Sequence, residues 1–320
     1  MRIFEVNEHG LEEIEKVSIA ERLSSDSLGP IWVDLIGPSP DDIQLMRDVF
    51  KFHMLAIEDT VNKRQRPKIE DYGSHFFLIL NPATLNQQEL DIRELDIFIG
   101  RNFIVTVHQK DEPIIDKTLA AARNRLLAGK RLSPGVILYT LVDLVVDLYF
   151  PILDVLEDEI DDIGDEVVKV PRQIYLRRLL EIKRSLAEMW RITTQQREAI
   201  NLLSREDQDL IRDDSLRYFL RDVTDHIIRL SDTINILRDT LLSTVDLYFS
   251  SQSNRLNTVV RRLTFITIGI GVLTVISGFY GMNFMETWPP FNTPLGVPFV
   301  LLMMGFGILV VLYFARHAEK

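Results

Sequence analysis

Two apolar segments of eighteen residues each lie close together near the C-terminus, Leu263–Tyr280 and Val297–Phe314. At roughly 1.5 Å per residue, each would form a helix about 27 Å long, which is just enough to cross the hydrocarbon core of a bilayer. The sixteen residues between them, Gly281–Gly296, hold a single charged side chain, Glu286. The sequence therefore predicts a transmembrane hairpin with helices at about 263–280 and 297–314.

Positive charge flanks this predicted hairpin at both ends. Arg255, Arg261 and Arg262 precede the first segment, and Arg316 and Lys320 follow the second. Because basic residues are enriched on the cytoplasmic side of membrane helices, both termini are predicted to be cytoplasmic. The expected location is the plasma or inner membrane, and the lipid bilayer is an expected partner.

The rest of the chain is acidic. The formal net charge is −11, and residues 251–320 carry five basic and two acidic side chains, so residues 1–250 hold −14. Such a surface gathers divalent cations and repels nucleic acid, which is not an expected partner. The chain has no cysteine, which excludes disulfides, thiolate metal sites and a cysteine nucleophile.

Residues 1–130 have the pattern of a cytoplasmic α/β domain. Short β-branched or alternating runs predict strands at Ile31–Leu35, Phe76–Leu80, Leu95–Ile99 and Asn102–Val107. Residues Pro40–Phe50 place two acidic side chains in a first turn, followed by apolar residues at helical spacing. This segment is predicted to be a helix.

Residues 131–262 are predicted to be a stalk of very long helices. Val136–Val168 is helix-periodic with interruptions only at Pro151 and Gly164, and residues 172–268 contain neither Gly nor Pro. The polar run Ser204–Asp214 is the expected turn. One helix is then predicted from near residue 215 to Tyr280, which leaves residues 263–320 as the membrane domain.

One face of the first membrane helix is small or polar. Residues spaced alternately three and four apart form this stripe: Asn257, Val260, Thr264, Thr267, Gly271, Thr274, Gly278 and Gly281. Most other positions from 263 to 280 are large and apolar. The stripe is consistent with tight helix packing or with the lining of a pore. A pore would require a homo-oligomer with its axis along the membrane normal, because one helix cannot enclose a channel.

At Tyr280-Gly-Met-Asn-Phe284 the chain resembles the CorA family of divalent-cation channels, whose motif is Gly-Met-Asn at the end of the first membrane helix. Other segments also resemble the family: Ala56–Asp59, Arg64–Lys68, Leu138–Asp143, Asp147–Phe150, Phe219–His226 and Ser250–Asn257. The resemblance implies an α+β membrane protein that forms a homopentamer, with an N-terminal α/β domain, a funnel of long helices and two C-terminal membrane helices.

The resemblance also implies roles for residues along the pore. Tyr280, Gly281, Met282 and Asn283 would form the outer mouth, where oxygen atoms meet a hydrated cation. Asn257, Thr264 and Thr274 match polar pore positions, and Leu263 matches a hydrophobic constriction.

Regulatory carboxylates are implied in the same way. Glu58, Asp59 and Asp222 match sensor positions of the family, and Asp143 and Asp147 are further candidates. Carboxylates of neighbouring subunits would repel one another unless a divalent cation bridged them. The alternative is that these side chains are solvated or pair with arginines, for which the candidates are Arg64, Arg66 and Arg221.

Two features depart from the family pattern. Met285–Pro290 stands where Met-Pro-Glu-Leu often follows the motif, and Gly271-Val272 stands where a bulky residue and a proline are frequent. The first change concerns cation capture and metal preference. The second concerns an upper gate of the pore, which is expected to be wider or absent.

The predicted function is influx of Mg²⁺, with Co²⁺ or Ni²⁺ as further cargo, driven by the membrane potential and gated by Mg²⁺ on the cytoplasmic side. The alternative is Zn²⁺ transport, as in the related zinc-transporting branch. No organic cofactor is expected. A membrane-anchored enzyme is disfavoured because no nucleophile elbow, phosphate loop or histidine ligand spacing is found. A scaffold that does not conduct remains a third possibility.

Overall fold

The computed structural model describes residues 1–7, 10–14, 19–23, 29–62, 65–86, 88–205, 214–282 and 294–318. The chain divides into two compact units. The first unit contains Met1–Ile163 and Ile174–Thr244, and the second contains Gly164–Gln173 and Val245–Lys320.

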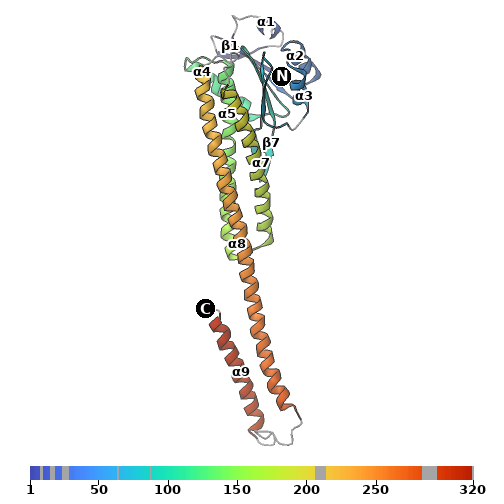
Figure 1. Cartoon of the computed structure of the whole chain (residues 1–320), viewed down its shortest axis with the longest axis vertical. Coiled ribbons are helices and arrows are strands. Elements are labelled where there is room, and N and C mark those ends of the chain that lie inside the picture. Colours follow the sequence, from blue (N-terminus) through green and yellow to red (C-terminus); the bar gives the residue numbers. More distant parts are fainter. Residues whose placement is uncertain are drawn as a thin grey trace. The chain divides into compact units, whose positions relative to one another are not determined.

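The N-terminal part of the first unit is built on strands of one main sheet and one small ribbon (Figure 1). The strands are β1 (Arg2–Asn7), β2 (Gly10–Glu13), β3 (Ile31–Ile36), β4 (Lys68–Asp71), β5 (Phe76–Leu80), β6 (Ala83–Asn86), β7 (Glu89–Ile92), β8 (Leu95–Ile99) and β9 (Phe103–His108). In the described residues the main sheet has the order β2-β1-β3-β9-β8-β5-β4, and β6 pairs with β7. The β3–β9 pair is parallel, and the other neighbouring strands are antiparallel. The four strands predicted from the sequence are therefore confirmed.

The helices are α1 (Ile19–Leu23), α2 (Pro40–Asp48), α3 (Met54–Val61), α4 (Pro113–Leu127), α5 (Pro134–Asp147), α6 (Tyr149–Lys169), α7 (Gln173–Arg205), α8 (Asp214–Tyr280) and α9 (Gly296–Ala318). The predicted α2 is confirmed, and its N-terminus is fixed by a capping box between Ser39 and Asp42. The predicted turn between α7 and α8 lies partly outside the described residues. At roughly 1.5 Å per residue, the 67 residues of α8 form a helix about 100 Å long.

The main sheet is buried on both faces. One face packs on α2 and α3, where Met46 and Ile57 join a core with Val33 and Phe98. α5 packs against β8 and β9. Because the central strands lie between these layers, β5 and β8 are buried along their whole length.

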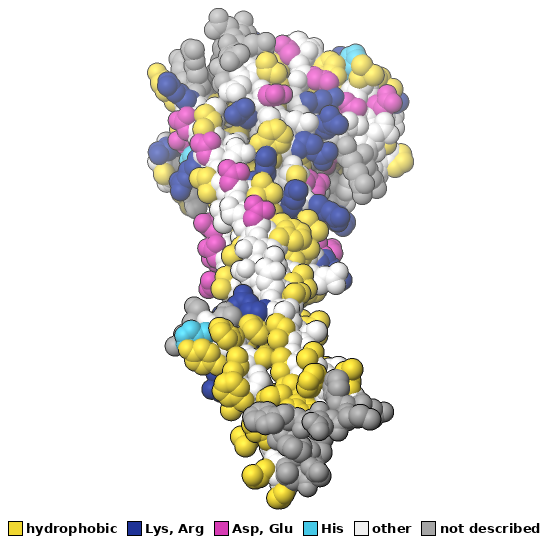
Figure 2. Space-filling model, turned by 60° about the horizontal axis from the view of Figure 1, so that its bottom comes forward, with side chains coloured by type: hydrophobic (Ala, Val, Ile, Leu, Met, Phe, Trp, Pro, Cys, Tyr) yellow, Lys and Arg dark blue, Asp and Glu magenta, His cyan; other side chains and the backbone are white. Residues whose placement is uncertain are grey.

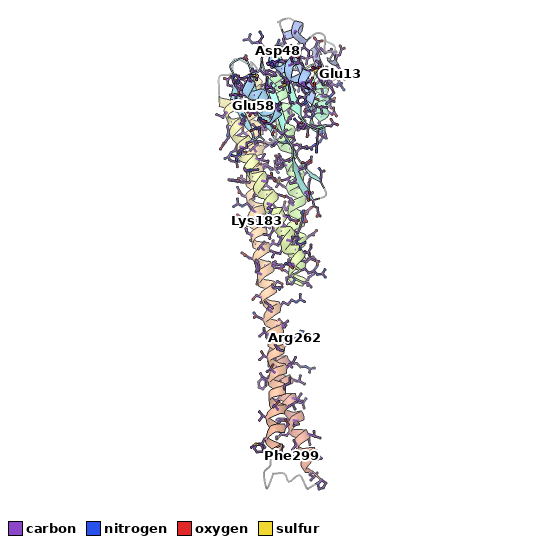
Figure 3. The ribbon with its side chains drawn as sticks, turned by 90° about the vertical axis from the view of Figure 1, so that its right-hand side faces the viewer. Glu13, Asp48, Glu58, Lys183, Arg262 and Phe299 are labelled. Atoms are coloured by element: carbon purple, nitrogen blue, oxygen red, sulfur yellow. The ribbon has the colours of Figure 1, made fainter. Side chains whose placement is uncertain are left out.

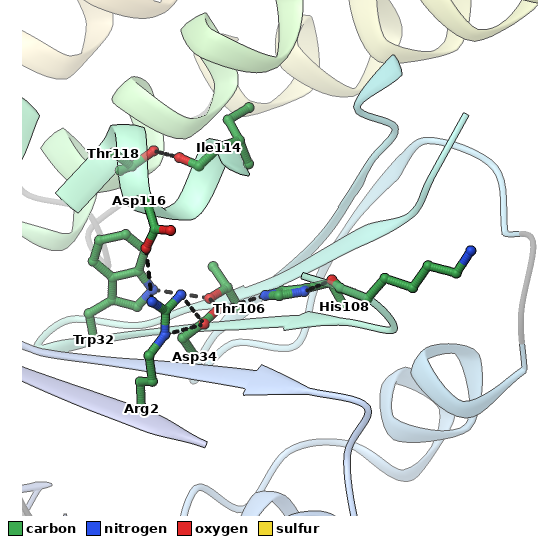
Figure 4. A network of polar contacts seen from close by, with 9 residues as sticks. Arg2, Trp32, Asp34, Thr106, His108, Ile114, Asp116 and Thr118 are labelled. Atoms are coloured by element: carbon green, nitrogen blue, oxygen red, sulfur yellow. Dashed lines mark hydrogen bonds and ion pairs between the residues drawn. The ribbon is translucent and has the colours of Figure 1, made fainter. Parts of the chain in front are cut away.

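A buried charge network ties β1, β3 and β9 together (Figure 4). The fully buried Asp34 accepts hydrogen bonds from Arg2 (Nη2–Oδ2, 3.0 Å) and Thr106 (Oγ1–Oδ1, 2.7 Å). His108 lies against the same carboxylate (Nε2–Oδ1, 2.9 Å), and its Nδ1 faces the carbonyl oxygen of Lys110. Since both ring nitrogens of His108 face acceptors, the network favours the imidazolium form.

Three described helical stretches are long and apolar enough to cross a membrane: Pro134–Lys169, Tyr218–Tyr280 and Gly296–His317. In the first, 56% of the most apolar window is buried inside the structure, whereas the corresponding values for the other two are 0% and 6%. The first stretch therefore supplies core side chains within its own unit. The other two contain the segments predicted to form the membrane hairpin, Leu263–Tyr280 and Val297–Phe314.

In the second unit, hydrophobic side chains gather on the surface of α9 and the C-terminal part of α8 (Figure 2). The two helices approach closely at Gly307, where a Cβ atom would lie 2.7 Å from Cγ1 of Val272. A small residue is needed there because the helix surfaces meet.

Candidate metal centre and ion path

The polar stripe of α8 lies on exposed helix surface. Every stripe position from Asn257 to Gly281 is exposed, and a Cβ atom built on Gly271 or Gly278 would meet nothing within 4 Å. The half-buried positions within residues 257–281 lie on a different face of the helix; they include Phe265, Gly269 and Val272. The stripe therefore faces away from the side of α8 that packs against α9.

The hydroxyl groups of the stripe present oxygen lone pairs outward. The Oγ1 atoms of Thr264, Thr267 and Thr274 each donate to the carbonyl oxygen four residues earlier, at 2.9, 2.9 and 2.8 Å. Each hydroxyl proton is thus used within the helix, which leaves the oxygen free to accept from water. Such a row of neutral oxygens suits a hydrated cation.

The helix ends immediately before the predicted mouth. α8 terminates at Tyr280, the amide of Gly281 donates to the carbonyl of Ser277 at 2.8 Å, and the side chain of Met282 is exposed. Asn283 lies outside the described residues, and so does the segment 285–290, whose sequence differs from the family pattern.

The stripe also continues toward the N-terminus at the same spacing. Asp246, Ser250 and Ser253 precede Asn257 at intervals of three or four residues, and all three are exposed. The sequence reasoning missed Asp246, although extending the same spacing would have identified it. A carboxylate at this end of the stripe would attract cations.

Two of the predicted sensor residues lie on α3. Glu58 is exposed on the helix surface (Figure 3). Asp59 forms an ion pair with Lys68, with Oδ2 and Nζ 2.6 Å apart. The partner of Asp59 is therefore a lysine, and none of the arginines considered from the sequence pairs with it in the described residues.

The last turn of α5 and the neighbouring part of α8 form a compact group of metal-ligating side chains. One ligand atom each from Asp143, Asp147 and His226 lies within 4.8 Å of the others. His226 Nδ1 is 3.7 Å from Oδ1 of Asp143 and 3.6 Å from Oδ1 of Asp147, which is too long for hydrogen bonds. Among the residues that the structure describes, neither Nδ1 of His226 nor Oδ1 of Asp143 has a hydrogen-bond partner, although both atoms are buried. Unpartnered, converging ligand atoms are what a metal centre requires.

The electrostatics of this group disfavour additional negative charge. Burial, followed by repulsion from Asp147, raises the pKa of Asp143, and Asp222 contributes in the same direction. Asp222 is exposed and precedes His226 by one helical turn. The structure thus brings Asp143, Asp147 and Asp222 near one another, whereas Glu58 and Asp59 do not belong to the group.

Carboxylates with one imidazole fit Co²⁺, Ni²⁺ or Zn²⁺, and they fit Mg²⁺ through the carboxylate oxygens alone. His226 was not predicted as a ligand because the histidines were judged by their spacing along the sequence. Asp143 and Asp147 are four residues apart on one helix, and His226 comes from another. Contact between helices that are far apart in the sequence cannot be deduced from the spacing of residues along the chain.

Residues 27–316 match the family model described as CorA-like Mg²⁺ transporter protein. The chain belongs to the CorA family. The cobalt/magnesium transport protein CorA of Thermotoga maritima is 33% identical over 98% of this chain and 91% of that protein. A putative metal ion transporter of Bacillus subtilis, YfjQ, is 31% identical over 93% of this chain and 92% of its own length.

The fold has a counterpart among solved structures. The complete structure of the CorA magnesium transporter from Methanocaldococcus jannaschii matches with a TM-score of 0.82 and 20% identity, covering 98% of this chain and 96% of that chain. The predicted architecture of a soluble domain, long helices and apolar C-terminal helices is therefore confirmed. The CorA family is one of membrane transporters for divalent cations, not of enzymes.

Proposed function

We propose that this CorA-family chain is a channel for Mg²⁺, with Co²⁺ or Ni²⁺ as further cargo. The observation that carries the proposal is the exposed stripe of hydroxyl oxygens and glycines on α8, which leads to Gly281-Met282-Asn283. A face of this kind is costly against acyl chains and useful against water. Neutral oxygens are suited to Mg²⁺ because this ion gives up its water shell reluctantly.

The channel is proposed to be a homopentamer. A single stripe encloses no path, so several copies of α8 must face a common axis along the membrane normal. In that arrangement the stripe lines the pore, and α9 and the apolar faces of α8 contact lipid or neighbouring helices. Leu263, which is 61% exposed in the single chain, would be the hydrophobic constriction.

The membrane potential is the proposed driving force. It supplies about 2.3 kcal/mol per elementary charge per 100 mV, and therefore about 4.6 kcal/mol for a divalent cation. Both termini are proposed to be cytoplasmic, so Asp246 and the acidic first unit would lie on the side where the cation arrives.

Regulation is proposed at the cytoplasmic carboxylates Glu58, Asp59, Asp222, Asp143 and Asp147, with His226 as an added ligand. Without a bound cation these groups repel one another within and between subunits. A bound divalent cation would supply the positive charge that holds them together and would favour a closed ring. Loss of the cation would then release the helices.

Divalent uptake into sealed proteoliposomes with an inside-negative potential tests this function. Mg²⁺, Co²⁺ and Zn²⁺ are offered separately to the wild type, to Asn283→Ala and to the control Asn254→Ala, which changes an exposed residue outside the stripe. We expect Mg²⁺ entry that is lost in Asn283→Ala and kept in Asn254→Ala. No entry of any ion would contradict the channel and favour a scaffold.

Zn²⁺ transport is the second candidate function. The imidazole of His226 favours it, because nitrogen ligands suit Zn²⁺ better than Mg²⁺. The oxygen-only stripe favours Mg²⁺. Preferential Zn²⁺ entry that follows a pH gradient instead of the potential would support the zinc-transporting alternative.

A further inference from the structure

Lys68 holds Asp59 in an ion pair that also includes Glu70. The Nζ atom of Lys68 is 2.6 Å from Oδ2 of Asp59 and 2.6 Å from Oε1 of Glu70. It also lies 5.6 Å from the centroid of the Phe77 ring, within the range of a cation–π contact. One ammonium group is therefore shared between two carboxylates that come from α3 and β4.

The surrounding structure fixes this geometry. Lys68 and Glu70 are two residues apart on β4, so their side chains emerge on the same face of the strand. The hydroxyl of Tyr72 donates to the other oxygen of Glu70, Oε2, at 2.6 Å. The ring of Tyr72 stacks on His53, whose Nδ1 accepts from the amide of Leu55 and caps the N-terminus of α3. The helix that carries Asp59 and the strand that carries Lys68 are thus held together.

The pair is partly shielded from water. The side chains of Lys68 and Asp59 are 31% and 25% exposed. Burial opposes the charge on Lys68, but hydrogen bonds to Asp59 and Glu70 outweigh this effect and raise its pKa. Lys68 therefore remains a cation throughout the physiological pH range.

We propose that Lys68 is a built-in competitor of the regulatory divalent cation at Asp59. A cation that binds Asp59 must displace the ammonium, which stays on Glu70 and Phe77. The strength of the Lys68–Asp59 pair then sets the cation concentration at which the sensor responds. This inference rests on the proposed sensor role of Asp59.

The test measures the Mg²⁺ concentration that gives half-maximal protection of the full-length protein, in detergent, from limited chymotrypsin digestion. Lys68→Gln removes the competing charge, and Lys68→Arg keeps it. Lys183→Gln makes the same charge change at an exposed site on α7 (Figure 3). Asp59→Asn removes the sensor carboxylate. Thermal unfolding in metal-free buffer checks that each variant is folded.

We expect Lys68→Gln to lower the midpoint by about fivefold, the upper end for a partly shielded ion pair. Lys68→Arg and Lys183→Gln should stay within about twofold of wild type. An unchanged or raised midpoint in Lys68→Gln, or an equal decrease in Lys183→Gln, would overturn the competitor role and leave the sensor intact. If the wild type shows no Mg²⁺ protection, or Asp59→Asn keeps the wild-type midpoint, the sensor role of Asp59 fails and the inference fails with it.

Discussion

Two segments of the same helix, α8, differ in whether their apolar side chains are buried or exposed. From Leu220 to Leu241, apolar residues spaced three and four apart are buried, and charged residues lie between them. In residues 263–280 no side chain is buried, although all the large ones are apolar. The first segment therefore buries one row of apolar side chains, here called the seam, and exposes its polar groups. The seam consists of Leu220, Val223, Ile227, Leu230, Ile234, Leu237 and Leu241. The second segment exposes apolar groups around a polar stripe, as expected for a helix whose surroundings are lipid on most sides.

The largest expected effect tests the seam with two isoleucines of the first segment. Ile234 is fully buried, and Ile236 is 63% exposed. Ile234→Ala should destabilise the protein by about 2–5 kcal/mol because it leaves a cavity, whereas Ile236→Ala should cost less than about 0.5 kcal/mol. Chemical unfolding followed by circular dichroism measures both. An equal decrease in the free energy of unfolding in both variants would show that burial in the seam does not stabilise the protein.

The second prediction tests the stripe with two glycines of the second segment. Gly271 lies on the stripe and Gly269 lies off it, and a Cβ atom at either position meets nothing within 4 Å. Gly271→Leu should reduce Mg²⁺ uptake by about tenfold or more, since it narrows and dries the path. Gly269→Leu should stay within about twofold of wild type. A comparable loss in both variants would indicate packing damage instead of a pore.

The third prediction concerns the candidate metal centre formed by Asp143, Asp147 and His226. His226→Ala should weaken Co²⁺ binding to the full-length protein by about tenfold and Mg²⁺ binding by less than about twofold, because only softer cations use the imidazole nitrogen. Isothermal titration with each metal measures the two changes. His317→Ala, which removes an exposed histidine of α9, is the control. Equal weakening of both metals would mean that His226 acts through packing and not as a ligand.

The fourth prediction concerns the buried charge network of His108 and Asp34 in the main sheet, outside α8. Burial opposes the charge on His108, but the hydrogen bond to Asp34 outweighs it and raises the pKa of His108. Burial likewise opposes ionisation of Asp34, but contacts with His108, Thr106 and Arg2 lower its pKa.

The contribution of His108 is fully present below its unfolded pKa of about 6.5 and is lost as pH rises through the higher folded value. That of Asp34 is present above its unfolded pKa and is lost as pH falls through the lower folded value. Thermal unfolding should therefore move to lower temperature as pH rises above about 6.5, and His108→Gln should flatten this slope. A wild-type slope that persists in His108→Gln would contradict the network's role.

Much of the fold could be predicted because local signals agreed with it. The absence of Gly and Pro from residues 172–268 predicted the long helices, and the acidic first turn at Asp41 and Asp42 predicted α2. Short strands such as β1, β4 and β7 were not predicted, because four to six residues with charged members carry little periodicity. Their pairing partners lie far away in sequence.

The candidate site divides in the same way. The stripe could be predicted because all its members belong to one helix, where spacing gives position directly. The approach of His226 to Asp143, and of Lys68 to Asp59, depends on packing between separate elements. The spacing of residues along the sequence does not predict such contacts.

The most direct test of the central claim uses the chain's lack of cysteine. Single cysteines introduced at each position from Thr264 to Gly278 can be modified with a charged thiol reagent while Mg²⁺ uptake is measured. Block is expected at the stripe positions 264, 267, 271, 274 and 278, and little effect at Phe265, Gly269 or Val272. Block without this three-and-four spacing, or strongest at the positions off the stripe, would contradict a pore lined by this face of α8.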